Sequence, residues 1–375
     1  MSGNKAHNSN MSLRKGDKWV NNMPNRDQFS GCLIGGALGD ALGYVVEFDR
    51  WEEIAQRFGA NGIQKPVANG ITGKYIISDD TQMTLFTAEG IIWARRKEEQ
   101  VGLSNVTSCC FYSYQRWLHT QFEELAQKDY EWVLDDERLG VEVKLLACEN
   151  LFHLRAPGTT CLNALKNAKD QNYGTIEQPV NDSKGCGGVM RVAPIGLYYY
   201  QDYRKAFSVA AKVAAITHGH PSGYLSAGAL ASIIANLLDG KTLSQAITMT
   251  LALLTIYAGH QETVTAIKEA VALASLETPK RELLVTLGEG WVAEECLAIA
   301  LYCALSYPND YLSAVRLAVN HSGDSDSTGA VCGNLLGVML GESKLPIDWV
   351  ARIECRDELT QFGDIFYQDT FGKTI

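Results

Sequence analysis

The sequence predicts an all-α fold with at most a minor β-hairpin, and three observations support this. Apolar residues recur at helical spacing along most of the 375 residues, whereas a convincing extended pattern occurs only within residues 61–77. A hydrophobic content of 46% with only 9 prolines describes a globular chain that can bury a large core. We expect one domain at residues 30–375 and a flexible N-terminal arm at residues 1–29, although length alone would allow two domains.

The arm is short of aliphatic side chains and rich in Asn, Lys, Arg and Ser. It carries five basic and two acidic residues, whereas the whole chain has a net charge of −10. One interpretation is a frayed, solvated tail. The other is an arm that docks in an acidic or anionic cleft of a partner, with basic residues around four apolar anchors, Leu13, Trp19, Val20 and Met23.

The domain opens with GCLIGGALGDALGYVVEF, in which glycines recur every four residues on one helical face, at Gly31, Gly35, Gly39 and Gly43. Each interior glycine costs a helix about 1 kcal/mol relative to alanine, so this face predicts close approach by a neighbouring helix or by a ligand. Glu47 follows the helix. It is either an ordinary exposed acid or a carboxylate that reaches a metal or a bound sugar.

A short helix is expected at residues 51–58, and a loop with a hairpin at residues 61–77. Ser78-Asp79-Asp80-Thr81 then gathers carboxylates and hydroxyls just before a helix at residues 81–97, whose basic end suits a helix C-terminus. Further helices are expected at residues 105–117, 142–154 and 160–169.

A glycine-rich loop, NDSKGCGGVMRVAP, interrupts the helical pattern between residues 174 and 194. Its glycines could let backbone N–H groups point at phosphates, or could simply form turns. Six helices follow, at residues 206–216, 222–238, 243–257, 262–276, 291–306 and 311–319. His218 and His220 lie between the first two at a spacing seen in zinc sites. Because no cysteine or third histidine stands nearby, a loop histidine that contacts a ligand or a carbonyl is favoured.

A second acidic cluster, NHSGDSDSTGA, precedes a helix at residues 328–340 with glycines at Gly329, Gly333 and Gly337 and a natural stop at Gly341. Asp324, Asp326 and the hydroxyls after them offer only oxygen ligands, which suit Mg²⁺ or Mn²⁺. The alternative is that Asp326 or Ser327 merely caps the helix. The two acidic clusters can hold one or two metal ions only if the fold brings two helix starts together.

Composition excludes several classes of protein. Ten cysteines without a C-x-x-C pair indicate reduced thiols, not a disulfide framework or a zinc site. No apolar run approaches a membrane span and the N-terminus is polar, so we expect a cytoplasmic protein without a membrane partner. The negative charge argues against nucleic-acid binding.

These segments together resemble the ADP-ribosylglycohydrolase family, which includes the dinitrogenase-reductase-activating glycohydrolases and removes ADP-ribose from modified proteins. The matching segments run in the family's order from about residue 30 to 355: GCLIGGALGDALGYVVEF, SDDTQMTLFTAEG, SKGCGGVMRVAPIGL, THGHPSG, LGEGWVAEECLAIALYCAL and AVNHSGDSDSTGAVCGNLLG. The resemblance implies a compact, orthogonally packed multi-helix catalytic domain. It does not extend to residues 1–29 and is poor over residues 119–150, where features particular to this protein are expected.

The resemblance also implies a centre of two Mg²⁺ ions, or Mn²⁺ in some members. By motif match the metal ligands are Ser78, Asp79, Asp80, Asp324, Asp326 and Ser327. Glu47 matches an acid near the metals and the distal ribose, His218 would line the pocket, and the diphosphate and ribose would lie on Gly185, Cys186, Gly187, Gly188 and Val189. Many relatives have Asn at the position of Cys186 and Thr at those of Ser78 and Ser327, which could change affinity while keeping oxygen ligation of the metals.

The expected function is a metal-dependent hydrolase that removes ADP-ribose, arginine-linked, from a modified protein. Asp80 would receive the proton of the attacking water and Glu47 would position the substrate. Some bacterial members similar to this chain are immunity proteins that reverse the modification made by an ADP-ribosyltransferase toxin and cover its active site with an N-terminal extension. The alternatives are a non-catalytic interaction protein that blocks a partner's active site, and a metal phosphohydrolase that cleaves the diphosphate.

Overall fold

The computed structural model describes residues 23–123, 125–168, 172–276 and 278–372. Over these residues the regular structure is helical, and β pairing is limited to isolated bridges such as the antiparallel one between Ala68 and Tyr75, so the predicted all-α fold is confirmed. The helices are α1 (Arg26–Gly43), α2 (Trp51–Phe58), α3 (Asp79–Val101), α4 (Val106–Phe122), α5 (Asp136–Leu139), α6 (Thr159–Lys166), α7 (Ala193–Tyr198), α8 (Tyr203–Ala215), α9 (Pro221–Leu238), α10 (Leu243–Leu254), α11 (Gln261–Ala274), α12 (Leu284–Leu287), α13 (Ala293–Ser306), α14 (Tyr311–Val319), α15 (Ser325–Leu340), α16 (Ile347–Val350) and α17 (Arg356–Phe371).

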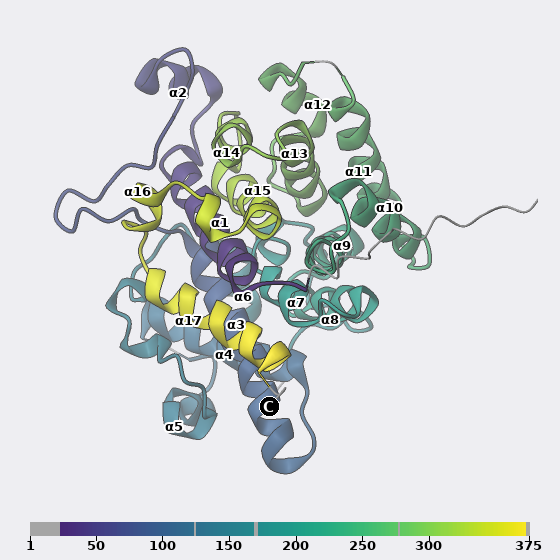
Figure 1. Ribbon diagram of the computed structural model, residues 1–375. Helices are drawn as coiled ribbons and strands as arrows, with labels where there is room; N and C mark the ends of the chain where they lie inside the picture. Colours follow the sequence, from purple (N-terminus) through teal and green to yellow (C-terminus); the bar gives the residue numbers. More distant parts are fainter. Residues whose placement is uncertain (1–22, 124, 169–171, 277, 373–375) are drawn as a thin grey trace, which may run out of the picture.

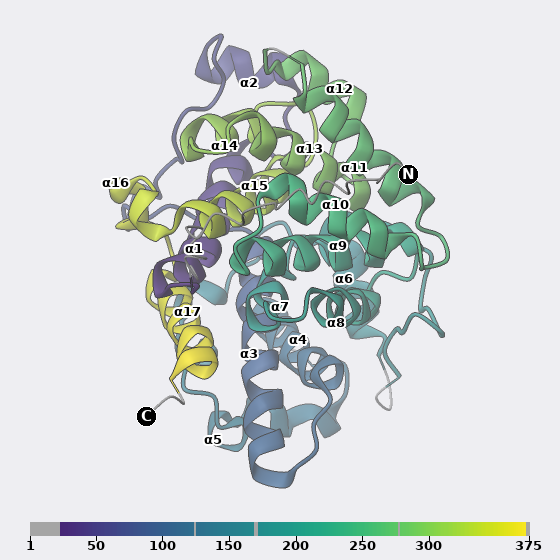
Figure 2. The same cartoon turned by 45° about the vertical axis from the view of Figure 1, so that its right-hand side comes forward.

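Helices α1 and α15 form the centre of the molecule, although they lie near opposite ends of the sequence (Figure 1). Seen from both directions, α3 and α4 lie below this pair, α8 to α11 lie to one side, and α17 packs along α1 (Figure 2). Helices α1 and α9 are long and apolar enough to cross a membrane by length and composition, but 89% and 94% of their apolar windows are buried inside the fold. Such burial is typical of the core helices of a globular protein.

The glycines of α1 and α15 face one another along the whole antiparallel contact. A Cβ atom placed on Gly31 would lie 2.6 Å from the carbonyl oxygen of Gly337, and one on Gly35 would lie 2.5 Å from that of Gly333. Real Cβ atoms do not approach other atoms so closely, so only glycine permits this backbone contact. Of the two interpretations of the glycine face, the neighbouring helix is therefore the right one.

This antiparallel packing has a consequence for chemistry. Gly43, at the end of α1, lies against the backbone of Ser325, at the start of α15. The acids at the end of α1 and the second acidic cluster therefore come to the same place, since any slip along the contact would put side chains where only glycines fit.

The start of the helical domain differs from the sequence prediction. Helix α1 begins at Arg26 because Asn25 and Gln28 form a capping box, so residues 26–29 belong to the helical domain and not to the arm. Residues 1–22 of the expected arm lie outside the described residues.

The predicted helix at residues 142–154 is wrong. The chain there forms only short 3₁₀ turns at Leu145–Ala147 and Glu149–Leu151. The side chains buried before and within this segment, Val141, Val143 and Leu145, lie two residues apart, which is not the spacing of a helical face. This irregular segment leads directly into the wall of the pocket described below.

Candidate active site

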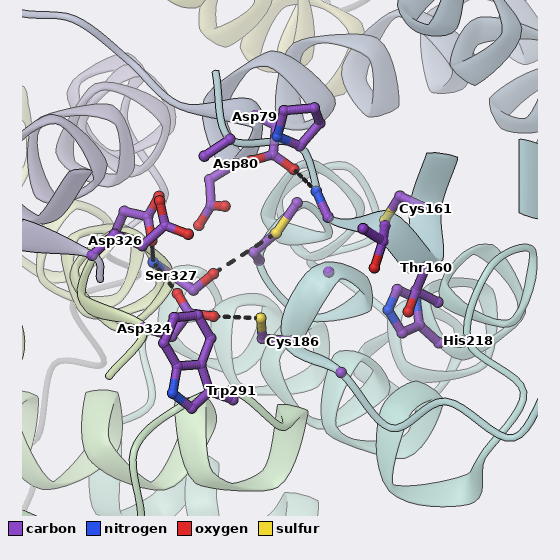
Figure 3. Close-up of a pocket in the computed structure, with 18 of the residues that line it drawn as sticks. Asp79, Asp80, Thr160, Cys161, Cys186, His218, Trp291, Asp324, Asp326 and Ser327 are labelled. Carbon is purple, nitrogen blue, oxygen red and sulfur yellow. Dashed lines mark hydrogen bonds between the residues drawn. The ribbon is translucent and has the colours of Figure 1, made fainter. Parts of the chain in front are cut away.

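The two acidic clusters meet in one pocket of about 350 Å³ (Figure 3). Asp79 and Asp80 form the first turn of α3, Asp324 is the N-cap of α15, and Asp326 lies in the first turn of α15. All four side chains are at most 4% exposed. The carboxyl groups of Asp80 and Asp326 face the same space (Figure 3). The fold therefore brings the two helix starts together, as a shared metal site requires.

Asp324 and Asp326 are fixed by the first turn of α15. Asp324 Oδ1 accepts a hydrogen bond from the Ser327 N–H at 3.2 Å, and Asp326 Oδ1 accepts one from the same N–H at 2.9 Å. Asp324 Oδ2 accepts a hydrogen bond from the thiol of Cys186 at 2.6 Å. The helix cap is therefore Asp324, not Asp326 or Ser327, and the second oxygen of Asp324 faces the thiol of Cys186, which lines the pocket.

The start of α3 is fixed by Asp40 of α1, which the sequence prediction left out of the site. The fully buried carboxylate of Asp40 accepts hydrogen bonds from the N–H groups of Ser78, at 2.9 Å, and Thr81, at 3.2 Å, and from the Thr81 hydroxyl. The Ser78 hydroxyl accepts a hydrogen bond from the Asp80 N–H at 3.2 Å and caps α3. Ser78 therefore supports the acidic turn from behind, and it is not among the residues that line the pocket.

A short loop, which the sequence did not single out, and the first turn of α6 after it form another wall. Ala156 to Cys161 line the pocket, and this loop is tied to Asp79 at two points. The Asp79 N–H donates to the carbonyl oxygen of Arg155 at 3.1 Å, and the Gly158 N–H donates to Asp79 Oδ2 at 3.3 Å. Ala156 has a φ of +54°, in the left-handed region that side chains other than glycine rarely adopt. Strained backbone of this kind is often found at functional sites.

The donors in this pocket suit hard cations. Five carboxyl groups line it, those of Glu47, Asp79, Asp80, Asp324 and Asp326, and the described residues that line it include no lysine or arginine. Glu47 Oε2 and Asp80 Oδ2 are buried without a hydrogen-bond partner. Buried carboxylates without partners are costly, and Mg²⁺ or Mn²⁺ would supply the missing positive charge through oxygen ligation.

The pKa values of the buried acids also favour cation binding. Burial raises the pKa of Asp79, Asp80 and Asp326 well above the usual range, and the negative charges of neighbouring aspartates raise these pKa values further. Burial, with the charges of Asp324 and Asp79, raises the pKa of Glu47 to about 9. Without a cation the cluster therefore holds protons, which a bound metal would displace.

The carboxylates are arranged around an open space. Among the described residues, no three acids of this cluster bring ligand atoms within 4.8 Å of one another. Such a spread does not define one tight ligand shell. It leaves room for cations and for substrate hydroxyls between the two helix starts.

The glycine-rich loop forms another wall of the pocket and adjoins the acidic cluster at Cys186. Gly185, Cys186 and Gly187 line it, whereas Gly188 and Val189 are buried behind them. Cys186 donates its N–H to the carbonyl oxygen of Trp291 at 3.1 Å, so this loop and the Trp291 segment are held together. A Cβ atom on Gly187 would lie 2.8 Å from the sulfur of Cys161, which explains glycine at this position.

His218 lies against this loop and not beside the carboxylates (Figure 3). Its Nδ1 shares a 2.8 Å hydrogen bond with the Thr217 hydroxyl. Burial, and then the charge of Arg191, lower the pKa of His218 to about 3, so the ring is neutral. The expectation that His218 lines the pocket agrees with this geometry, and His220 instead caps α9.

Two aromatic rings form the rim beside the acidic cluster. Phe48, next to Glu47, stacks on Trp291 with ring centroids 5.9 Å apart and planes 19° apart. Phe48 is 70% exposed and Trp291 39% exposed, so both keep ring surface in contact with solvent at the mouth. The sequence prediction did not include this pair, although both rings lie in segments that carry the family resemblance, because an aromatic ring offers no ligand for a metal and no acid or base.

Comparison with known proteins gives one consistent result. A family model described as ADP-ribosylglycohydrolase matches residues 21–374. The chain is 22% identical to ADP-ribosylarginine hydrolase Tri1 of Serratia proteamaculans, with 93% of this chain and 84% of that protein covered. It is 23% identical to ADP-ribosylhydrolase ARH3 of Gallus gallus, over 91% of this chain and 93% of that one.

Two further similarities cover comparable lengths. The chain is 23% identical to the ADP-ribosyl-[dinitrogen reductase] glycohydrolase of Rhodospirillum rubrum, over 88% of this chain and 92% of that one. Among solved structures, a chain of an ADP-ribosylglycohydrolase-related protein complex superposes with a TM-score of 0.56 at 22% identity, covering 92% of this chain and 98% of that one. At this identity the structural match supports the fold alone.

Proposed function

Because this chain belongs to the ADP-ribosylglycohydrolase family, we propose that it is a metal-dependent hydrolase that removes ADP-ribose from arginine side chains of modified proteins. The observation that carries the proposal is the convergence of two acidic helix starts on one pocket, with buried oxygens of Glu47 and Asp80 left without partners. A pocket that only bound a neutral sugar would not need this concentration of uncompensated carboxylates.

In this proposal Asp79, Asp80, Asp324 and Asp326 would hold two Mg²⁺ ions, or Mn²⁺. Ser327 would complete the ligand set, and Ser78 would support the first acidic turn from behind. When bound, these ions lower the pKa of a coordinated water and align the hydroxyls of the distal ribose. The negative aspartates hold the ions, and the fixed turns of α3 and α15 keep the carboxyl groups at their positions.

Side chains of the pocket would carry out the proton transfer and position the substrate. Asp80, through its unpartnered Oδ2, accepts the proton of the water that attacks C1′ of the ribose. As the bond from C1′ to the arginine nitrogen breaks, positive charge develops on the sugar, and the surrounding carboxylates stabilise it. Glu47, at the mouth between the acidic cluster and Phe48, positions the ribose hydroxyls.

The glycine-rich wall of the pocket suits the ADP portion. Gly185, Cys186 and Gly187 offer close backbone approach to the diphosphate, and neutral His218 adds a hydrogen-bonding ring without adding charge. The rim formed by Phe48 and Trp291 suits the arginine, since a guanidinium binds favourably over exposed aromatic faces. The name of the Serratia relative, an ADP-ribosylarginine hydrolase, also supports arginine.

The test is turnover of an ADP-ribosylated arginine substrate followed by mass spectrometry. Asp79→Ala and Asp326→Ala should abolish both Mg²⁺ binding and release of ADP-ribose, and a chelator should do the same to the unchanged protein. Glu269→Ala, an exposed acid on α11, is the matched control and should keep full activity. Undiminished hydrolysis by either aspartate variant would refute the proposal.

The same assay separates the rival functions. Release of AMP in place of intact ADP-ribose would indicate a phosphohydrolase acting on the diphosphate. Tight binding of the modified protein without any product would indicate a non-catalytic interaction protein. A role as an immunity protein that binds an ADP-ribosyltransferase toxin through the arm stays a prediction, tested by deleting residues 1–22 and measuring affinity for the toxin.

A further inference from the structure

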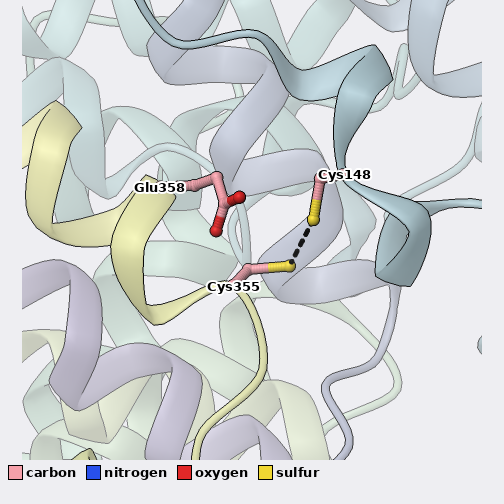
Figure 4. A group of neighbouring side chains, drawn as sticks. All are labelled: Cys148, Cys355 and Glu358. Atoms are coloured by element: carbon pink, nitrogen blue, oxygen red, sulfur yellow. Dashed lines mark hydrogen bonds between the residues drawn. The ribbon is translucent and has the colours of Figure 1, made fainter.

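A second cluster of metal-ligating side chains lies outside the pocket. It consists of Cys148, from the irregular segment before the pocket wall, and Cys355 and Glu358, from the start of α17 (Figure 4). The two sulfur atoms are 3.6 Å apart, and one ligand atom from each of the three residues lies within 4.8 Å of the others. Among the described residues, this is the one group of three or more His, Cys, Asp or Glu side chains that meets this criterion.

We propose that Cys148, Cys355 and Glu358 bind one Zn²⁺ ion, with a solvent molecule as the fourth ligand. Two thiolates bound to zinc at about 2.3 Å in tetrahedral geometry lie about 3.8 Å apart, close to the spacing observed here. Two thiolates and one carboxylate form a mixed soft and hard donor set, which suits zinc and does not suit Mg²⁺. The acidic pocket, with oxygen donors on its two helix starts, therefore selects a different ion.

The backbone conformation at Cys355 positions its sulfur atom. Cys355 has a φ of +52°, one of three non-glycine residues with positive φ among the described residues. This conformation costs about 1 kcal/mol or more, and it places the Cys355 sulfur at the N-terminus of α17, one turn before Glu358.

Binding is balanced in protons and charge. Two Zn–S bonds form as the thiols of Cys148 and Cys355 each release one proton to solvent, and the Glu358 carboxylate supplies a third bond. The site then carries a net charge of −1 from the ion and these three ligands. No oxidant or reductant takes part.

The position of the cluster gives the ion a structural task. From Cys148 the chain runs through irregular structure to Arg155 and Gly158, whose backbone groups hold Asp79. A zinc ion would join this segment to α17 and so hold one end of the pocket wall. Of the three non-glycine residues with positive φ among the described residues, Ala156 lies in the pocket wall and Cys355 lies in the cluster with Cys148 and Glu358.

Spectroscopy of the full-length protein tests the site. Reduced protein is stripped of metal and titrated with Co²⁺ in excess Mg²⁺, which fills the oxygen site first. We expect one equivalent of Co²⁺ with thiolate-to-cobalt charge-transfer absorption that Zn²⁺ then displaces. Cys148→Ser and Cys355→Ser should lose this absorption, and Glu358→Gln should bind Co²⁺ more weakly. Cys186→Ser, which removes the thiol beside Asp324, is the control and should keep it.

A second measurement needs no variant. Zn²⁺ should protect two thiols of the unchanged protein from alkylation, and peptide mapping should place them at Cys148 and Cys355. The proposal is overturned if no thiolate absorption develops, if the absorption is lost in Cys186→Ser and kept in Cys148→Ser, or if zinc protects neither thiol. A disulfide between Cys148 and Cys355 in freshly prepared, metal-free protein would also overturn it.

Discussion

Asp40 accepts hydrogen bonds from both the N–H group and the hydroxyl of Thr81, and these bonds join the end of α1 to the first turn of α3. With the bond from the Ser78 N–H, they hold the turn that carries Asp79 and Asp80. Asp40 touches no reacting atom in this arrangement. It is a positioning residue for the acidic cluster.

Asp40→Asn should therefore weaken both the fold and the metal site. The amide nitrogen would face donor groups, and leaving buried donors unpaired costs about 1–3 kcal/mol. We expect that loss in urea unfolding, together with weaker Mg²⁺ binding by calorimetry. Asp27→Asn on the same helix is the control, because Asp27 pairs with Ser343 at an exposed position. Equal Mg²⁺ affinities of the Asp40→Asn and unchanged proteins would contradict this role.

The glycine contact between α1 and α15 predicts a large steric effect. In Gly39→Ala the new methyl group would overlap the Gly329 carbonyl, and overpacking of this kind costs about 1–3 kcal/mol or more. Thermal unfolding measures the loss. Gly70→Ala is the matched control, because nothing lies within 4 Å of a Cβ atom there, and its midpoint should hardly change.

The raised pKa values of the buried acids predict how pH affects the metal-free protein. A carboxyl whose folded-state pKa lies above its unfolded value stabilises the fold at low pH and loses that contribution as pH rises through the folded value. For Glu47 the window runs from about 4 to about 9. In chelator, the melting temperature should fall as pH rises across this window.

Added Mg²⁺ should reverse that loss, and its stabilising effect should be larger at pH 8 than at pH 5.5, because fewer protons must be displaced at the higher pH. Scanning fluorimetry with and without Mg²⁺ measures both effects. Glu47→Gln should flatten the pH dependence in chelator. A greater stabilisation by Mg²⁺ at pH 5.5 would contradict the coupling.

The aromatic rim predicts a preference for arginine-linked substrates. Removing a cation–π partner costs about 0.5–2 kcal/mol, so Trp291→Ala should lower kcat/KM for ADP-ribosylarginine by roughly 2- to 30-fold. Trp291→Phe should restore part of the loss. Hydrolysis of a serine-linked substrate and affinity for free ADP-ribose should change little. An equal loss on both linkages would show that Trp291 acts only on the shape of the mouth.

Helical periodicity predicted most of the fold. It placed α2 and α14 with the bounds that the structure has, and it identified both glycine faces. Helical periodicity is a wrong guide at residues 142–154, where the predicted helix is replaced by short 3₁₀ turns. Local patterns cannot distinguish such a segment, because its conformation depends on the surfaces that bury it.

The sequence likewise predicted some residues of the candidate site and not others. Asp79, Asp80, Asp324 and Asp326 stood out because each cluster is compact in sequence. Asp40 did not, because its importance comes from pairing with α3. The wall at residues 156–161 and the cysteine pair are also products of long-range packing, since Gly158 contacts Asp79 and Cys148 lies 207 residues from Cys355. The roles assigned to the individual site residues stay predictions that the variants above test.

The pairing of α1 with α15 also determines when the protein can become active during its synthesis. The ribosome makes α1 early and α15 late, and domains generally begin to fold from their N-terminal side as they emerge. The glycine face of α1 has to wait for its partner, and the same late helix delivers Asp326. A nascent chain arrested before residue 324 lacks both Asp324 and Asp326, so the acidic pocket cannot be complete until α15 has been made.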